Sequence, residues 1–347
     1  MNSRKVQMPR EVHIGPDLIF NTGNVCKDLR LDNKALIVTG DNTYKIAAKK
    51  AIESLEEKNF TTDVIKVKEA DMNSVRAVEE KSEDFSFILG IGGGKVIDVA
   101  KMASNNKNIY FISVPTTAAH DGIISPLASI KDSNGSVSMK AQAPLGVIAD
   151  TNIISHAPFK FLAAGCADLI SNFTAIKDWK LAHSLNNEYY SESAATLSEI
   201  SAKLITKHSL DIKEDSEKST RLVVKTLFSS GMAISIAGSS RPASGSEHKF
   251  SHALDQLLNK PTLHGNQCGV GTIMMMHLHG GDWRCIKENL EKIGAPTNAF
   301  ELGVDPDLII EALVNANKIR PERYTILGKN GLSKREAKEL AIKTEVI

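Results

Sequence analysis

Two histidines, His248 and His252, follow a turn of serine and glycine in the segment SRPASGSEHKFSH (240–252). Residues four apart share one face of a helix, so both imidazoles can point to the same place. Asp168 stands among apolar residues in FLAAGCADLISNF, where an acidic side chain is costly to bury without a partner such as a cation. Together with His264 of TLHGNQCGVG, these are the residue types that hold a zinc ion with one coordination position open.

Other interpretations of these residues stay open at this stage. A single histidine is more often structural than metal-binding, and two histidines with one acid also suit iron(II). Cys268 comes four residues after His264 and could share its helix face as a sulfur ligand. A free cysteine more often packs as a small core residue, so we favour a ligand set without it.

A glycine-rich loop, GIGGGKVID (90–98), matches neither common phosphate-binding motif. The dinucleotide fingerprint needs glycine where Lys95 stands, and the P-loop needs glycine at Leu89 and Ser or Thr at Val96. The loop still carries a buried strand into three glycines and a helix start, where free backbone N–H groups bind pyrophosphate. We therefore expect a dinucleotide pyrophosphate at Gly92, Gly93 and Gly94; the alternative is a tight turn, with Asp98 favourably placed in the first turn of the helix.

Two further loops follow predicted strands. VPTTAAHDGIISP (114–126) offers small residues that let a flat ligand approach the backbone, followed by His120 and Asp121. Asp41 follows the strand at 34–40 and could bond a cofactor ribose, or cap the helix that begins near Thr43. In parallel sheets ligands bind beyond the carboxyl ends of the strands, which is where these loops would lie.

The elements that must position these residues differ between the two halves of the chain. Strand and helix patterns alternate in the first half, which predicts an α/β fold with a parallel sheet covered on both faces. Beyond about residue 155 the patterns are helical. We predict a Rossmann-like domain over 1–155 and an all-helical domain over 156–347, with a ligand cleft between them. The expected strands are 34–40, 61–67, 85–94, 108–117 and 145–150, and a hairpin is expected around Asn134-Gly135.

Composition excludes several classes of protein. The 347 residues carry a net charge of +1, which produces no field that attracts nucleic acid or anionic lipid. The apolar stretches are shorter than a membrane span, so we expect no membrane insertion, and the N-terminus lacks the apolar segment of a signal peptide. The four cysteines contain no C-x-x-C pair and are typical of reduced thiols in a cytoplasmic protein.

The chain resembles the superfamily of glycerol dehydrogenases, dehydroquinate synthases and iron-containing alcohol dehydrogenases, and within it the glycerol-1-phosphate dehydrogenase family. The resemblance covers nearly the whole chain and rests on five segments in order: GIGGGKVIDVAK, VPTTAAHDGIISPLASI, GCADLISN, SRPASGSEHKFSHALD and LHGNQCGVG. It implies a dehydroquinate-synthase-like fold with cofactor and metal in the cleft between the two domains. Asp168 stands where dehydroquinate synthases have Glu, and His252 where iron-type alcohol dehydrogenases have a further ligand.

The resemblance assigns roles position by position. It places zinc at Asp168, His248 and His264, and it places Asp121, Asp168 and His252 against the substrate. It places NADPH or NADH along three segments, which comprise Gly94, Lys95, Val96, Ile97 and Asp98; Thr116, Thr117, Ala118 and Ala119; and Ser125.

The implied reaction is reduction of dihydroxyacetone phosphate to sn-glycerol 1-phosphate, the backbone of archaeal-type membrane phospholipids. Asp121 and His252 are the candidate catalytic residues, since either could supply the proton. The partner is then a small-molecule substrate, and a homo-oligomer remains open. Two alternatives are a zinc-dependent glycerol dehydrogenase acting on an unphosphorylated polyol and a dehydroquinate-synthase-like lyase. A nucleotide-binding protein with a structural metal is disfavoured, because structural zinc sites usually have four protein ligands.

The substrate phosphate requires an anion site of its own. Our candidates are Asn172, Arg241 and the backbone of residues 244–246, because Arg241 stands just before a serine-glycine turn that could form an anion nest. The alternative is that the turn is an ordinary helix N-cap, made by Ser244 or Ser246.

Overall fold

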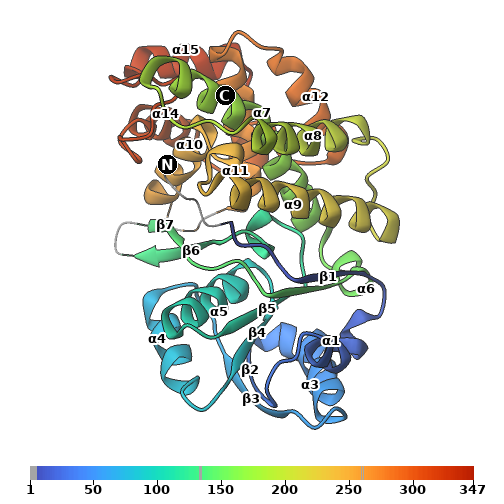
Figure 1. Cartoon of the computed structure of the whole chain (residues 1–347). Coiled ribbons are helices and arrows are strands. Elements are labelled where there is room, and N and C mark those ends of the chain that lie inside the picture. The colour runs from blue at the N-terminus through green and yellow to red at the C-terminus, as the bar shows by residue number, and fades with distance from the viewer. Residues whose placement is uncertain (1–5, 133–134, 259, 261) are drawn as a thin grey trace.

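The computed structural model describes residues 6–132, 135–258, 260 and 262–347. Its larger sheet has six strands, in the spatial order β1-β8-β5-β4-β2-β3, and every neighbouring pair is parallel. Figure 1 shows this sheet in one half of the molecule and a group of helices in the other. The strands are β1 Glu11–Gly15, β2 Lys34–Thr39, β3 Thr61–Lys66, β4 Phe87–Gly92, β5 Tyr110–Pro115 and β8 Gly146–Asp150.

The two faces of this sheet bury different side chains of the same strands. Ile37 and Leu89 pack on one face with the helices α1 and α3, whereas Leu36 and Ile88 pack on the other with α4 and α5. Both faces are covered, so the central strands are continuous apolar runs. The helices are α1 Thr22–Asp28, α2 Asp41–Thr43, α3 Lys49–Glu56, α4 Met72–Lys81 and α5 Gly94–Lys107, with a π-helical turn over Tyr44–Ala48.

The predicted α/β fold and its five strands are confirmed, but β1 was not expected. Its sequence EVHIG is half-buried over four of five residues and lies at the edge of the sheet, paired only with β8. A short edge strand with charged and polar residues lacks the apolar pattern from which strands are predicted.

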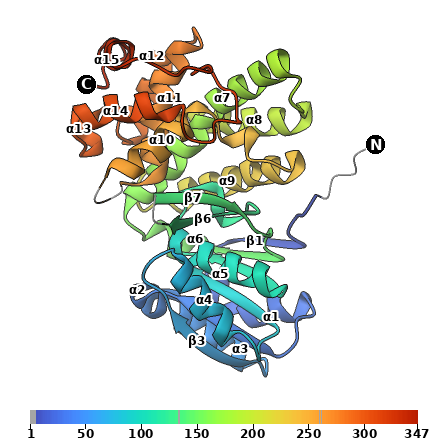
Figure 2. The same ribbon diagram turned by 90° about the vertical axis from the view of Figure 1, so that its left-hand side faces the viewer.

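A separate antiparallel hairpin lies between the sheet and the helices (Figures 1 and 2). It consists of β6 Leu127–Asp132 and β7 Gly135–Lys140, and β6 packs on α5 while β7 packs on α10. The hairpin was predicted around Asn134-Gly135; Gly135 pairs with Asp132, and Asn134 lies outside the described residues. The hairpin therefore links the two halves beside the cleft.

All described strands precede residue 151, and the elements after it are helices. They are α6 Thr151–Ser155, α7 Phe159–Asn186, α8 Glu192–Lys207, α9 Glu217–Ala237, α10 Ser246–Leu257, α11 His264–Leu278, α12 Trp283–Ile293, α13 Ala299–Leu302, α14 Pro306–Ala316 and α15 Lys334–Lys343, with a 3-10 turn at Arg241–Ala243. Two further 3-10 turns, Leu18–Asn21 and Asp121–Ile123, lie in the first half of the chain. The division of the chain at residues 155 and 156 stays a prediction.

The helix α7 corrects one expectation. The sequence was expected to hold no apolar stretch long enough to cross a membrane, yet α7 has 28 residues and qualifies by length and composition. Its most apolar window is 78% buried inside the fold, where α7 packs against α8 and α11. The apolar surface of α7 is therefore that of a core helix.

Candidate active site

A single cleft with a volume of about 1230 Å³ brings the predicted functional segments together. Its floor is formed by the loops that follow β2, β4 and β5, because the carboxyl ends of parallel strands meet at one edge of the sheet. Its opposite wall carries Asp168, His248, His252 and His264 from the helical half. A ligand on the glycine loop therefore faces the histidines across the cleft.

The glycine loop has the geometry of an anion site at a helix start. β4 ends at Gly92, Gly93 is the extended N-cap, and α5 begins at Gly94. The first N–H groups of a helix have no partner within it and point out of its N-terminus, where the helix dipole favours negative charge. No acidic side chain lies in this first turn. Asp98 is instead buried and accepts the backbone N–H of Ser129 at 3.1 Å, which corrects the expected first-turn position.

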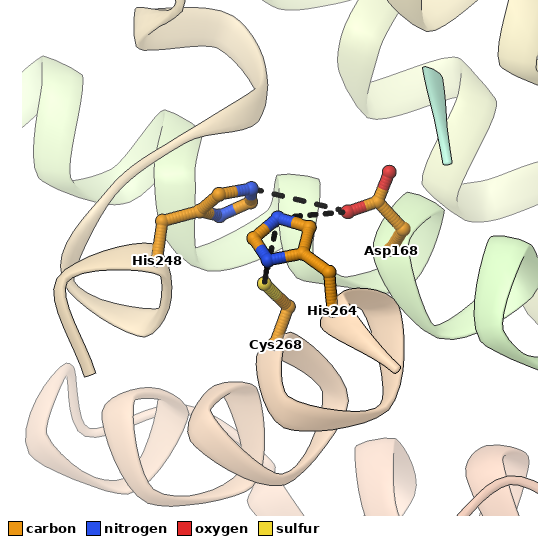
Figure 3. A group of neighbouring side chains, drawn as sticks. All are labelled: Asp168, His248, His264 and Cys268. Atoms are coloured by element: carbon orange, nitrogen blue, oxygen red, sulfur yellow. Dashed lines mark hydrogen bonds and ion pairs between the residues drawn. The ribbon is translucent and has the colours of Figure 1, made fainter. Parts of the chain in front are cut away.

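Three helices converge on a cluster of metal-binding side chains (Figure 3). Asp168 comes from α7, His248 from α10, and His264 and Cys268 from α11. The Oδ1 atom of Asp168 lies 3.9 Å from Nε2 of His248 and 4.0 Å from Nε2 of His264. The four ligand atoms lie within 4.8 Å of one another, so one cation can contact all of them.

The ring nitrogens of both histidines are oriented by neighbouring side chains. Nδ1 of His248 lies 2.9 Å from the carboxylate of Glu247, so it carries the proton and leaves Nε2 free to bind a metal. The hydroxyl of Ser251 donates its only hydrogen to Gln267, so it accepts one from Nδ1 of His264, 3.1 Å away. Both Nε2 atoms thus present lone pairs toward Asp168.

The electrostatics of the cluster fit a divalent cation. Burial, and next the charge of Asp121, raise the pKa of Asp168 to about 6, so its carboxylate lacks compensating positive charge. Burial, and next the charge of His248, hold the pKa of His264 well below its ordinary value, which keeps the ring neutral. Burial lowers the pKa of His248, but Cys268 and then Glu247 outweigh it and raise this pKa well above its ordinary value, so His248 releases a proton when a metal binds. A buried carboxylate and a neutral imidazole are ligands suited to zinc.

The ligands meet because α7 and α11 approach closely at Gly265. A Cβ atom there would lie 2.0 Å from the carbonyl oxygen of Ala164, a contact that forces backbone to move. We expect Gly265→Ala to push α11 away from α7 and so to separate His264 from Asp168. Because overpacking costs about 1–3 kcal/mol, zinc binding should weaken about tenfold or more. Titration with a competing chelator measures the zinc affinity of the variant.

Gly15→Ala is the matched control for this prediction. A Cβ atom at Gly15 meets nothing nearer than 3.8 Å, so this variant should keep wild-type zinc affinity. Equal zinc affinities of the two variants would contradict a role of the helix approach in metal binding.

Comparisons with known proteins agree with this architecture. A family model described as iron-containing alcohol dehydrogenase matches residues 13–158. Glycerol-1-phosphate dehydrogenase (NAD(P)+) of Methanobrevibacter smithii is 65% identical over 347 residues, covering 100% of both chains, and that of Methanothermobacter thermautotrophicus is 60% identical over the same span. The chain belongs to the glycerol-1-phosphate dehydrogenase family. Glycerol dehydrogenase from Schizosaccharomyces pombe shares the fold with a TM-score of 0.81 at 19% identity, over 99% of this chain and 91% of that one.

Most of the residues expected to contact the cofactor, from the sequence or from the family resemblance, line the cleft. Three lie beneath its surface: Gly92 ends a buried strand, and Ile97 and Ala118 are buried in the core. The residues that line the cleft are Asp41, Gly93, Gly94, Lys95, Val96, Asp98, Thr116, Thr117, Ala119 and Ser125.

Asp41 does not cap the helix that follows it. It is the first residue of α2, with Gly40 as N-cap, and its carboxylate pairs with Lys66 at 3.1 Å. The N–H of Gly40 donates instead to the hydroxyl of Thr43. Asp41 thus lines the cofactor end of the cleft with a lysine as counter-ion.

Asp121 and His252 lie beside the metal-binding cluster. The backbone N–H of Asp121 donates to Oδ2 of Asp168 at 3.2 Å, and its side chain accepts from the hydroxyl of Ser230. Burial raises the pKa of Asp121. Burial, and next the charge of His248, lower the pKa of His252 to about 3, so this imidazole is neutral at physiological pH.

The expected phosphate-binding residues are not brought to the cleft. Arg241 is buried in an ion pair with Glu188 and donates to the carbonyl of Tyr324. Asn172 is buried and donates to Ser198 and Ser230. Both side chains are engaged elsewhere because they point into the helical core.

The backbone of residues 244–246 is not an anion nest either. The N–H of Gly245 donates to Glu247, and the N–H of Ser246 donates to Asp178, each at 2.6 Å. Carboxylates already occupy these donors. Neither Ser244 nor Ser246 is the N-cap of α10, because Gly245 holds that position.

Proposed function

We propose that this chain reduces dihydroxyacetone phosphate to sn-glycerol 1-phosphate, with NADPH or NADH as hydride donor and zinc at Asp168, His248 and His264. The observation that carries the proposal is that the metal-binding cluster and the glycine loop open onto one cleft. Relatives that match the full length of the chain are named for glycerol 1-phosphate, the product of this reduction, and for NAD(P)+. Residues 1–155 would bind the cofactor, and residues 156–347 would bind the metal and substrate.

The chain's own residues position the reactants. When bound, the nicotinamide supplies the hydride and zinc polarises the ketone as a Lewis acid. The N-terminus of α5 holds the pyrophosphate at Gly93 and Gly94, which directs the nicotinamide toward Thr116–Ala119. A ketone in the cleft would lie between the glycine loop on one side and Asp168, His248 and His264 on the other, since all of these line it.

Asp121 and His252 are the residues that we assign to hold and deliver the proton. Both line the cleft next to the ligands. Asp121 is anchored from two sides, through its N–H to Asp168 and through its carboxylate to Ser230. His252 is a neutral imidazole that lines the cleft, so a ring nitrogen can exchange a proton with water or substrate there.

The test is an assay of the purified protein with zinc, NADPH or NADH, and two substrates. We expect loss of nicotinamide absorbance with dihydroxyacetone phosphate, little loss with dihydroxyacetone, and sn-glycerol 1-phosphate as the product enantiomer. Preference for dihydroxyacetone would support a glycerol dehydrogenase instead. Release of inorganic phosphate without net change in absorbance would support a lyase of the dehydroquinate synthase type.

A further inference from the structure

A partly buried arginine lies behind one wall of the cleft. The Nη1 atom of Arg323 donates to Oγ of Ser240 at 2.9 Å, to the carbonyl of Ser244 at 3.2 Å and to Oγ of Ser244 at 3.4 Å. In the described part of the chain, Arg323 has no carboxylate within ion-pair distance, whereas the neighbouring Arg241 is paired with Glu188. The positive charge of Arg323 is therefore directed at two serines.

Both serines line the cleft and keep a donor free. Ser240 is 7% exposed and Ser244 is 8% exposed, and each hydroxyl accepts from Arg323. Among the described residues neither hydroxyl donates to an acceptor, so its hydrogen is available to a ligand. A guanidinium that donates to a hydroxyl polarises it and strengthens the hydrogen bond that the hydroxyl gives.

Around this wall the four cationic side chains of Arg241, Lys249, Arg320 and Arg323 stand against three carboxylates, those of Asp178, Glu188 and Glu322. Lys249 is 3% exposed, and burial, with Arg241 and Arg323 next, lowers its pKa to about 8. The side chain of Arg320 donates to the carbonyl of Ser138, which also lines the cleft. The nearby carboxylate of Asp178 is occupied by Ser246 and Ile326. An anion in the cleft would offset this excess charge.

A second observation also points to a missing ligand at this wall. The Nδ1 atom of His252 is buried and has no hydrogen-bond partner among the described residues. A buried polar atom without a partner is costly, and such atoms in native folds often mark a ligand or water position. His252 lines the same cleft as Ser240 and Ser244.

We propose that the hydroxyls of Ser240 and Ser244, polarised by Arg323, bind the phosphate group of the substrate and select phosphorylated over unphosphorylated ketones. This inference rests on the proposed function. Ser244 and His248 line the same cleft, so a substrate whose phosphate contacts Ser244 can extend toward the metal-binding cluster. In this assignment Ser240 and Ser244, supported by Arg323, replace Arg241 and Asn172 as the residues that contact the phosphate.

Two variants test this inference. Arg323→Gln removes the charge, and the double variant Ser240→Ala/Ser244→Ala removes the donors while leaving Arg323 in place. The control is Arg335→Gln, which removes an arginine with an 86% exposed side chain on α15. For each zinc-loaded protein we would measure kcat/KM for dihydroxyacetone phosphate and for dihydroxyacetone, competitive inhibition by inorganic phosphate, and the midpoint of thermal unfolding.

We expect both variants to lower the ratio of the two kcat/KM values about 10- to 100-fold, through a higher KM for the phosphorylated substrate, and to weaken inhibition by phosphate similarly. Arg335→Gln should match the wild type. If both folded variants keep the wild-type ratio and phosphate inhibition, the phosphate site lies elsewhere. If the wild type itself does not reduce dihydroxyacetone phosphate, the proposed function fails first. If Arg323→Gln unfolds, the serine variant decides alone.

Discussion

Replacement of His264 by alanine is expected to remove bound zinc and to lower turnover at least about a thousandfold, because a Lewis acid contributes several kcal/mol of transition-state stabilisation. His264 begins α11, and its Nε2 is directed at Asp168, 4.0 Å away. Without this ring the cluster keeps only one imidazole, and the affinity for zinc falls steeply. Metal analysis after dialysis and steady-state kinetics measure both losses.

His277→Ala is the matched control, since His277 lies on the same helix outside the metal-binding cluster. This variant should keep both its zinc and its turnover. The metal assignment would be wrong if His264→Ala kept full activity after treatment with a chelator. Cobalt(II) substitution adds a spectroscopic check, because a thiolate ligand from Cys268 would give an intense near-ultraviolet band that Cys268→Ser removes.

The main sheet was predictable because its signals are local. Each central strand is a short run of mostly buried apolar residues, and a helix pattern follows most of them. The strands β2, β4 and β5 end at or just before glycine or proline, whereas β8 ends at Asp150. Such runs do not depend on distant parts of the chain. The strand β1 lacked this signal, since only Gly15 of its five residues is buried. The sequence did not predict the full length of the apolar helix α7, because alanine, glycine and polar residues interrupt its run of large apolar side chains.

The candidate metal ligands could be predicted from residue type, whereas the residues that orient them could not. An aspartate in an apolar helix and a histidine pair at helical spacing are visible in a sequence. The role of Glu247 depends on burial, and its position directly before His248 gave the only local hint. Ser251 offered none, because its hydrogen bonds cross from α10 to α11.

The proposed phosphate contact illustrates why neighbours along the chain do not identify a binding site. Arg241 stands beside the serine-glycine turn in the sequence, but its side chain turns away to Glu188. The arginine that contacts Ser240 and Ser244 comes from position 323, about eighty residues later. Only tertiary structure brings these segments together, so no local pattern could choose Arg323 over Arg241.

Replacement of Gly94 by aspartate is expected to raise the KM for NADPH at least about 100-fold while leaving the zinc content unchanged. Gly94 is the first residue of α5, where the helix dipole and the free N–H groups favour an anionic pyrophosphate. A carboxylate at this position would repel the cofactor's phosphates and compete for the same N–H groups. Steady-state kinetics measure the KM for NADPH, and fluorescence titration measures its affinity. Metal analysis of the same sample measures the zinc content.

Gly94→Ala isolates the steric part of this effect. A Cβ atom at Gly94 would lie 2.3 Å from Nε2 of His120, whose Nδ1 accepts the N–H of Gly122 and limits its movement. Alanine should therefore weaken NADPH binding too, but less than aspartate, because it adds no charge. Equal NADPH affinities of wild type, alanine and aspartate variants would show that the pyrophosphate binds away from this helix start. Loss of zinc from the aspartate variant would show that the glycine loop and the metal cluster are not independent.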